Sequence, residues 1–288
     1  MKSIGILYIC TGPYYLFWED FFKSFEAKFL TDYEKKYFVF TDAKHIYAED
    51  NPNVKKYKLD PQPWPLITLL RFATFLSIKN DLKDCDYLMF SNANIVCDDF
   101  ITESEFLPRI EKGEKIFVTS HPGYYKKDKL SFPYERHSRS LAYVPWNCGE
   151  NYVIGAMFGG TRNAFLTMAK VLNTRIEEDL KRNVIALWHD ESHLNRYIVN
   201  RYDVRVLHPM YCYPYGLNVS YGKKLSAVGK QSKFDVNKFK GQYDNKPITI
   251  KRIIKKINEI TKLASIVMLA FDTITFKRVK IIDYEEEK

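Results

Sequence analysis

The sequence predicts an α/β fold, in which a sheet of buried strands is flanked by helices. Short apolar runs typical of buried strands alternate along the chain with segments whose apolar residues recur at helical spacing. Several of these apolar runs end directly in polar residues, and open α/β sheets bind their ligands at such strand ends. The 288 residues, 46% of them hydrophobic, are enough for one large domain with a substantial core.

The first predicted strand is the apolar run of residues 4–9. A turn at residues 11–14 follows, and a helix is expected next because six apolar residues recur at helical spacing: Leu16, Phe17, Phe21, Phe22, Phe25 and Phe29. Four further apolar runs are expected to be strands: residues 37–40, 87–90, 116–119 and 204–207.

Three more helices are expected. One opens at Trp64-Pro65 and carries Ile67, Leu70, Phe72 and Leu76, one spans residues 164–180, and one begins within residues 188–197. Residues 121–150 show no regular periodicity, and a loop of that length in a compact domain is usually functional. The small residues between Asn151 and Gly160 are expected where a ligand or another backbone approaches closely.

The segment from Trp188 to Tyr197 carries five ionisable residues, which is unusual for a core helix. Asp190 and Ser192 are suitable N-cap residues, and Leu194, Tyr197 and Ile198 supply one buried face. Two interpretations remain open. Either the segment is a capping box with a solvated charged face, or its first turn directs Glu191 and His193 into space beside the sheet.

Composition restricts the compartment and the partners. The five cysteines are scattered and form no CxxC pair, which suits buried thiols in a reducing compartment and argues against zinc. The first apolar run is too short for a membrane span and lacks a cleavage site, so we expect a cytoplasmic protein. The net charge of +9 suggests an anionic partner, but no nucleic-acid-binding motif is present, and we expect no nucleic-acid partner.

The pattern changes near residue 248, and we therefore expect a catalytic domain over residues 1–240 and a basic amphipathic tail over residues 241–288. In the tail, an isoleucine stripe opposes lysine and arginine residues, and the run 263–276 is largely apolar. This pattern is typical of a helix lying on an anionic membrane surface, here through residues 248–276 and on the inner membrane face. The alternative is a helix packed on the catalytic domain.

Several motifs occur together in one order. They are Tyr134-Glu135-Arg136, Ala142-Tyr143-Val144-Pro145, Phe158-Gly159-Gly160 and Trp188-His189-Asp190-Glu191-Ser192-His193-Leu194-Asn195. With these motifs, residues 4–235 resemble a bacterial member of glycosyltransferase family 6, whose animal relatives are the blood-group A and B transferases and the α-1,3-galactosyltransferases. The resemblance implies a GT-A fold, a Rossmann-like mixed sheet flanked by helices. It also implies retaining transfer of galactose or GalNAc from a UDP-sugar to the 3-hydroxyl group of a galactoside.

The resemblance assigns roles to individual positions. It implies that Glu191 is the catalytic carboxylate, which either bonds to the anomeric carbon or stabilises an oxocarbenium ion. Acceptor binding falls to His121 and Trp188. Donor binding falls to Ile9, Cys10, Thr11 and Tyr14 at the uridine, Arg71 near the sugar and diphosphate, Trp64 and Ile67 in the same lining helix, and Asp190 at the sugar hydroxyl groups.

One departure from the animal pattern concerns the metal. Where animal members have two aspartates that bind Mn²⁺, this chain has Asn92 and Asn94, in the NxN form of the bacterial members. Neutral amides are poor ligands for such a cation, so we expect no divalent metal cofactor. The leaving UDP still needs positive charge, which the resemblance places on Lys230, with assistance from Arg71.

The triplet Ile154-Gly155-Ala156 matches the residues that separate GalNAc users from galactose users. Small residues at the second and third positions favour UDP-GalNAc, whereas the methyl group of Ala156 keeps UDP-galactose open as the alternative donor. The loop Ser120-His121-Pro122-Gly123 is more similar to the blood-group enzymes and indicates a fucosylated acceptor. A protein of a different functional class also remains open. Asn92 and Asn94 are compatible with a carbohydrate-binding protein that has no catalytic activity.

Overall fold

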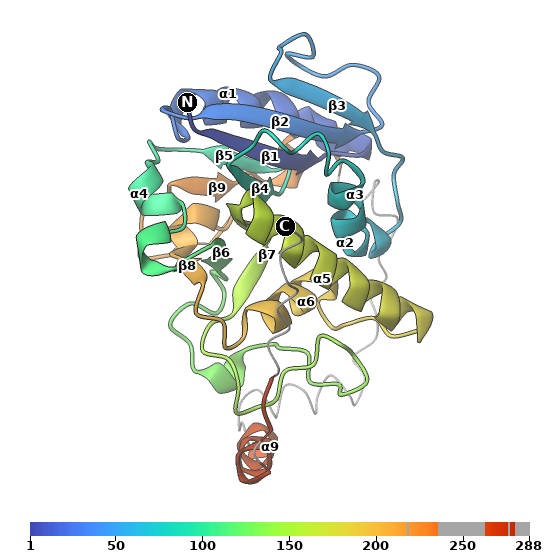
Figure 1. The fold of residues 1–288 in the computed structure, drawn as a ribbon, viewed down its shortest axis with the longest axis vertical. Coiled ribbons are helices and arrows are strands. Elements are labelled where there is room, and N and C mark those ends of the chain that lie inside the picture. Colours follow the sequence, from blue (N-terminus) through green and yellow to red (C-terminus); the bar gives the residue numbers. More distant parts are fainter. Residues whose placement is uncertain (218, 236–262, 276, 280–288) are drawn as a thin grey trace.

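The computed structural model describes residues 1–217, 219–235, 263–275 and 277–279. Its centre is a seven-stranded sheet in the order β3-β2-β1-β4-β7-β6-β8 (Figure 1). The strands are β1 (Ser3–Ile9), β2 (Glu34–Thr41), β3 (Val54–Lys58), β4 (Tyr87–Ser91), β6 (Ile116–Ser120), β7 (Val153–Thr161) and β8 (Val204–Leu207). All strands predicted from apolar runs are confirmed.

The sheet is mixed, as expected. Strands β3, β2, β1 and β4 run parallel, β7 is antiparallel to both β4 and β6, and β6 and β8 are parallel to each other. A second, two-stranded antiparallel sheet joins β5 (Ile95–Cys97) to β9 (Leu225–Ala227). The sequence analysis did not predict β3. Its sequence is Val-Lys-Lys-Tyr-Lys, and such lysine-rich strands are common at sheet edges, where they carry little apolar signal.

Helices cover both faces of the sheet. On one face, helix η1 (Gly12–Phe17) leads into α1 (Trp18–Lys28), whose aromatic side chains pack onto β1 and β2. On the other face, α3 (Arg71–Ser77), α5 (Arg162–Lys181) and α6 (His189–Ile198) share a core with Leu88, Phe90 and Phe158 (Figure 1). Where one helix was expected after Pro65, the structure has α2 (Leu66–Leu69) and α3, because Leu70 leaves helical geometry with φ −85° and ψ 0°.

The remaining helical segments are short. They are α4 (Glu103–Phe106), η2 (Ile110–Lys112), η3 (Lys129–Ser131), η4 (Pro209–Cys212) and η5 (Lys230–Ser232). Between residues 121 and 152 the chain forms only η3, which agrees with the expected long loop.

Helix α9 (Leu263–Ile274) lies at one end of the molecule, beyond this loop (Figure 1). The fully buried Asp272 accepts a 2.8 Å hydrogen bond from the backbone N–H of Trp146, and Val279 joins a cluster with Tyr134 and Tyr152. One face of α9 is therefore packed on the domain. Several large apolar residues of the helix are more than a third exposed: Ile266, Val267, Met268, Phe271 and Ile274.

The isoleucine stripe at residues 248–260 and the predicted domain boundary near residue 240 lie outside the described residues. Within the described part of the chain, no helix is long and apolar enough to cross a bilayer.

Candidate active site

A cavity of about 450 Å³ opens where β4, β6 and β7 meet α3 and α6. Strands β4 and β6 end here, at Ser91 and Ser120, whereas the antiparallel β7 begins here, so the start of one strand lies beside the ends of two others. The cavity brings together nine of the residues that the sequence singled out: Arg71, Asn92, His121, Ile154, Gly155, Ala156, Trp188, Asp190 and Glu191.

Glu191 lines this cavity and is held at both carboxylate oxygens. Its Oε1 accepts a 2.8 Å bond from the hydroxyl group of Tyr152, and its Oε2 accepts a 2.8 Å bond from the backbone N–H of Gly155. Burial nevertheless raises the pKa of Glu191 to about 7, although both hydrogen bonds oppose that shift; the nearby Asp190 adds to the rise. The carboxylate is therefore fixed in position and changes its charge near neutral pH.

Asp190 is paired with a cation instead. Its Oδ2 lies 3.0 Å from Nη1 of Arg71, and both side chains are less than 10% exposed. The same Nη1 donates a 2.8 Å bond to the carbonyl oxygen of Gly155. Burial raises the pKa of Asp190, while Arg71 lowers it by stabilising the charged form. Adjacent carboxylates on one helix thus have different partners.

Gly155 connects these two carboxylates, because its N–H binds Glu191 and its carbonyl oxygen binds Arg71. A Cβ atom on Gly155 would lie 3.2 Å from Cβ of Glu191 and 3.4 Å from Oδ2 of Asp190. The small residue expected at this position, Gly155, therefore allows the first turn of α6 to pack closely against β7.

Asn195 fixes α6 against β7. Its side chain exchanges two hydrogen bonds with the backbone of Val153, at 2.9 and 2.8 Å, and its Nδ2 also reaches the carbonyl oxygen of Glu191. The expected N-caps at Asp190 and Ser192 were wrong. Trp188 is the N-cap residue, and its N–H donates to the hydroxyl group of Ser192 at 3.0 Å.

His193 does not point into the cavity beside Glu191. Residues two positions apart lie on nearly opposite sides of a helix. His193 is 1% exposed, and its Nε2 lies 3.6 Å from Oδ2 of Asp179 on α5. Burial lowers the pKa of His193 to about 4, so the side chain is neutral at physiological pH.

Aromatic residues form the outer part of the cavity. His121 packs against Tyr124, with ring centroids 5.0 Å apart, and burial lowers the pKa of His121 to about 4. Trp188 is 44% exposed at the cavity mouth. Beyond it, Trp64 contacts the ring of His189 edge-on at 4.5 Å. The two expected acceptor residues, His121 and Trp188, therefore share a cavity with Glu191.

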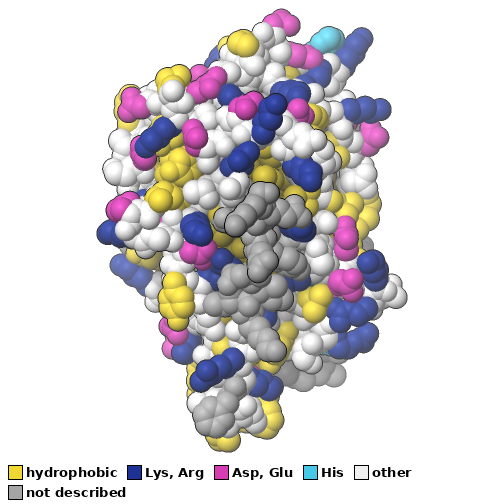
Figure 2. All heavy atoms as spheres, viewed as in Figure 1, with side chains coloured by type: hydrophobic (Ala, Val, Ile, Leu, Met, Phe, Trp, Pro, Cys, Tyr) yellow, Lys and Arg dark blue, Asp and Glu magenta, His cyan; other side chains and the backbone are white. Residues whose placement is uncertain are grey.

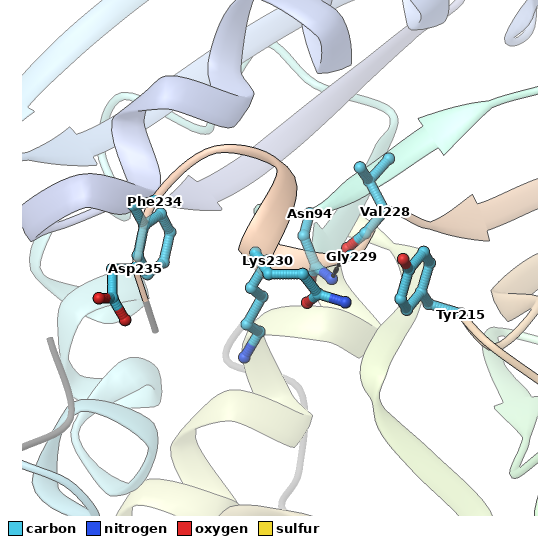
Figure 3. Close-up of a pocket in the computed structure, with 8 residues that line it drawn as sticks. Asn94, Tyr215, Val228, Gly229, Lys230, Phe234 and Asp235 are labelled. Atoms are coloured by element: carbon cyan, nitrogen blue, oxygen red, sulfur yellow. Dashed lines mark hydrogen bonds between the residues drawn. The ribbon is translucent and has the colours of Figure 1, made fainter. Parts of the chain in front are cut away.

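A second cavity, of about 700 Å³, contains Asn94 and Lys230 (Figure 3). Asn94 donates a 2.8 Å bond from Nδ2 to the carbonyl oxygen of Val228, and this bond ties the turn that precedes η5 to the end of β4. Nζ of Lys230 lies 5.1 Å from the ring centroid of Tyr14. Two expected donor residues that are far apart in sequence are thus in contact.

The other expected donor residues line neither of these two cavities. Cys10 and Thr11 are buried at the end of β1, and the N–H and carbonyl oxygen of Cys10 bind Phe40 and the hydroxyl group of Thr41. Ile9 is partly buried beside them, Ile67 lies on α2, and Trp64 is 60% exposed.

Two motifs outside the cavities hold the long loop in place. The carboxylate of Glu135 accepts bonds from the backbone N–H groups of His137 and Leu187, at 2.7 and 2.6 Å. Arg136 donates to the carbonyl oxygens of Val144 and Pro145. The long loop that begins at His121 is thereby attached directly before the α6 segment.

The sequence analysis assigned no site role to Tyr152, Thr68, Tyr124 or Asn195. Tyr152 binds Glu191 across 39 positions, and no local pattern marks such a contact. Asn195 was visible only as part of the motif at residues 188–195 that carries the family resemblance. Among the described residues, no group of three or more His, Cys, Asp or Glu side chains is arranged to hold a metal ion.

Comparison with known proteins identifies the family. The model of glycosyltransferase family 6 matches residues 1–238. The O-antigen biosynthesis glycosyltransferase WbnI of Escherichia coli is 37% identical over 194 residues, which cover 67% of this chain and 81% of that protein. The histo-blood group ABO system transferase 2 of Rattus norvegicus is 29% identical over 224 residues, covering 73% of this chain and 63% of that protein.

The globoside alpha-1,3-N-acetylgalactosaminyltransferase 1 of Gallus gallus is 30% identical over 220 residues, covering 73% of this chain and 61% of that protein. This chain thus spans less than two thirds of these two animal relatives, and most of the E. coli protein. The resemblance drawn from the motifs is confirmed, and the chain belongs to glycosyltransferase family 6.

Proposed function

We propose that this protein is a retaining, metal-independent α-1,3-N-acetylgalactosaminyltransferase. It moves GalNAc from UDP-GalNAc to the 3-hydroxyl group of a galactoside, and the acceptor is fucosylated. The observation that carries this proposal concerns the backbone of Gly155. Its N–H donates to the carboxylate of Glu191, and its carbonyl oxygen accepts from Arg71. Gly155 is the middle residue of the triplet that sets donor choice, and it also holds the expected catalytic carboxylate in place.

Retention supports the role of Glu191. The acceptor must arrive on the face that UDP leaves, so a carboxylate on the opposite face either bonds to the anomeric carbon or stabilises its positive charge. Both alternatives need an ionised carboxylate with a fixed position. Tyr152 and Gly155 supply the fixed position, and the pKa near 7 supplies the ionised form above neutral pH.

Metal independence is supported by the contacts that Asn94 and the two carboxylates make. Asn94 uses its side chain to hold the backbone of Val228, and the two carboxylates lining the first cavity already have partners in Arg71, Tyr152 and Gly155. These residues do not fit a divalent cation site. Lys230 instead lines the second cavity and carries the charge that stabilises the leaving diphosphate.

GalNAc is favoured as the donor sugar because Gly155 and Ala156, which both line the first cavity, are small residues. The Gallus gallus relative is named as an alpha-1,3-N-acetylgalactosaminyltransferase, which agrees with this choice. UDP-galactose remains the second candidate, because the methyl group of Ala156 lines the same wall and methyl groups discriminate by only about 1–3 kcal/mol.

The exposed face of α9 supports peripheral attachment to an anionic membrane. Its apolar residues lie at one end of the molecule (Figure 2), and Nζ of Lys277 lies 5.2 Å from the ring centroid of Phe271. Because Asp272 anchors this helix to Trp146, substitutions on the exposed face test the idea better than truncation does. Ile266→Ser combined with Phe271→Ser should abolish flotation with anionic vesicles, and unchanged flotation would rule out this surface.

The test of function is transfer from UDP-GalNAc and UDP-galactose to a 2′-fucosylated galactoside, with and without excess EDTA. We expect faster transfer from UDP-GalNAc, resistance to EDTA, and an α linkage in the product by NMR coupling constants. Sensitivity to EDTA would show that other groups recruit a metal. UDP binding without transfer or donor hydrolysis would favour a carbohydrate-binding protein instead.

A further inference from the structure

A third cavity, of about 420 Å³, lies beside the first one, at the ends of β6 and β8. Tyr124 lines both cavities, and Tyr152, which binds Glu191, lines the third cavity with its ring. The rings of Tyr124 and Tyr152 contact each other edge-on at 5.2 Å. The two cavities are therefore separated by one pair of tyrosines, on the side of the site where the acceptor residues lie.

The walls of this third cavity are aromatic. Tyr125 contacts His208 edge-on, with ring centroids 4.7 Å apart, and Phe132 contacts Tyr152 at 6.2 Å. Aromatic side chains combine an apolar face with polar groups at the edge, and such surfaces suit a sugar ring, which has apolar C–H faces and hydroxyl groups around its rim.

The cavity also carries positive charge. Lys126 and Lys127 line it, and their Nζ atoms lie 5.4 and 5.3 Å from the ring centroids of Tyr125 and Tyr124. Lys126 has φ +58°, a conformation that is uncommon for a residue other than glycine, and this turn holds two consecutive lysines at the rim. Glu150 is the lining carboxylate, and its Oε1 already lies 3.5 Å from Nζ of Lys129.

The charge of Lys127 extends to the first cavity, because it contributes to the lowered pKa of His121. An anion bound near these lysines therefore lies within electrostatic reach of the expected acceptor site.

We propose that this third cavity is an outer acceptor subsite, which holds the unit attached to the reacting galactoside and selects for an anionic group on that unit. This inference rests on the proposed function of the first cavity. The anion is a carboxylate of an acidic sugar or a phosphate that links the acceptor to a carrier, and both would pair with Lys126 and Lys127 in the same way.

Three acceptors with one terminal galactose distinguish a bound carboxylate from a bound phosphate. Each is used as its 2′-fucosylated derivative and is named here by the parent compound. Lactobionate and lactitol both carry galactose on an open-chain unit and differ in the presence of a carboxylate, and lactose 1-phosphate carries a phosphate. We expect the KM for lactobionate to be about fivefold lower than for lactitol, since one ion pair of this kind is worth up to about a factor of five. The difference should shrink as the salt concentration rises. A preference for lactose 1-phosphate over lactobionate would identify phosphate as the anion.

The matched variants are Lys126→Ala/Lys127→Ala and, as a control, Lys79→Ala/Lys83→Ala, which removes two exposed lysines from the α3 side. The first should raise the KM for lactobionate to the value for lactitol, with kcat and the kinetics of lactitol unchanged. The control variant should leave the kinetics of both lactobionate and lactitol unchanged.

Equal KM values for lactobionate and lactitol in the unmodified protein would overturn the subsite. An equal loss with both acceptors in the first variant would overturn its charge selectivity. If no acceptor is a substrate, the proposed function fails, and NMR titration of lactobionate against lactitol still decides the subsite. Tighter binding of lactobionate, lost in Lys126→Ala/Lys127→Ala, would support the subsite, and equal binding would refute it.

Discussion

Glu191→Gln is the substitution that tests the site most directly. Glutamine has nearly the same shape as glutamate, and its oxygen can accept from the N–H of Gly155 while its Nε2 donates to the hydroxyl oxygen of Tyr152. The variant should therefore keep the local structure and UDP binding. Because it lacks the charge that both retaining mechanisms need, we expect kcat to fall by at least about a hundredfold.

The same substitution has a predicted effect on stability. The pKa of Glu191 is raised from 4.5 to about 7 in the folded protein, so folding is favoured while the carboxyl group is protonated. This contribution is complete below pH 4.5 and is lost as the pH rises through about 7. A shift of 7 − 4.5 = 2.5 units corresponds to about 3 kcal/mol, and most of this is lost between pH 5 and pH 8.

Glutamine does not titrate, so Glu191→Gln should become more stable relative to the unmodified protein as the pH rises. Urea unfolding of both proteins at pH 5 and pH 8 measures this change. The unmodified enzyme should also gain kcat/KM as the pH rises through about 7. A constant stability difference between the two pH values, or loss of UDP binding in the variant, would refute this account of Glu191 and leave it a structural residue.

Three other predictions follow from single contacts. Arg71→Leu leaves the buried Asp190 without its cation, and urea unfolding should show a loss of about 3–5 kcal/mol; a loss below 1 kcal/mol would show that the pair is not needed for stability. Lys230→Ala should weaken UDP-sugar binding and transfer at least tenfold, whereas Lys233→Ala, one turn further and paired with Asp20, serves as the control and should have little effect. Asp272→Ala should lower the free energy of unfolding by about 1–3 kcal/mol, because the N–H of Trp146 loses its acceptor; unchanged stability together with unchanged protease resistance at Trp146 would show that α9 is not anchored there.

Much of the fold was predictable because several strands, such as β4 and β6, are buried along their whole length. Continuous apolar runs such as residues 4–9 and 116–119 leave few alternatives to a central strand, and both are central in the sheet. The lysine-rich β3 was missed because an edge strand buries little and so needs no apolar run. The break at Leu70 in the helix after Pro65 was missed, since the apolar spacing continues smoothly through that residue and the segment contains no breaker.

The site was predictable to a different degree for each residue. Glu191 and Asp190 stand in a string specific enough to identify the family, and their neighbours in the cavity were named by the same resemblance. The partners that give these carboxylates their properties were not predictable in that way. Nothing near Tyr152 in the sequence marks it as the donor to Glu191, and nothing near Arg71 marks it as the cation of Asp190.

The sequence by itself determined the family, the α/β class and the presence of Asn92 and Asn94 where the resemblance implies aspartates in the animal members, because each of these is written in residue types and their local order. Only the tertiary structure decided that Gly155 joins Glu191 to Arg71, that His193 faces away from the site, and that a lysine-bearing cavity lies beyond Tyr124. The physical reason is that hydrogen bonds, burial and pKa shifts depend on distances between atoms. Those distances join residues tens of positions apart, and they exist only after the sheet has brought its strand ends together.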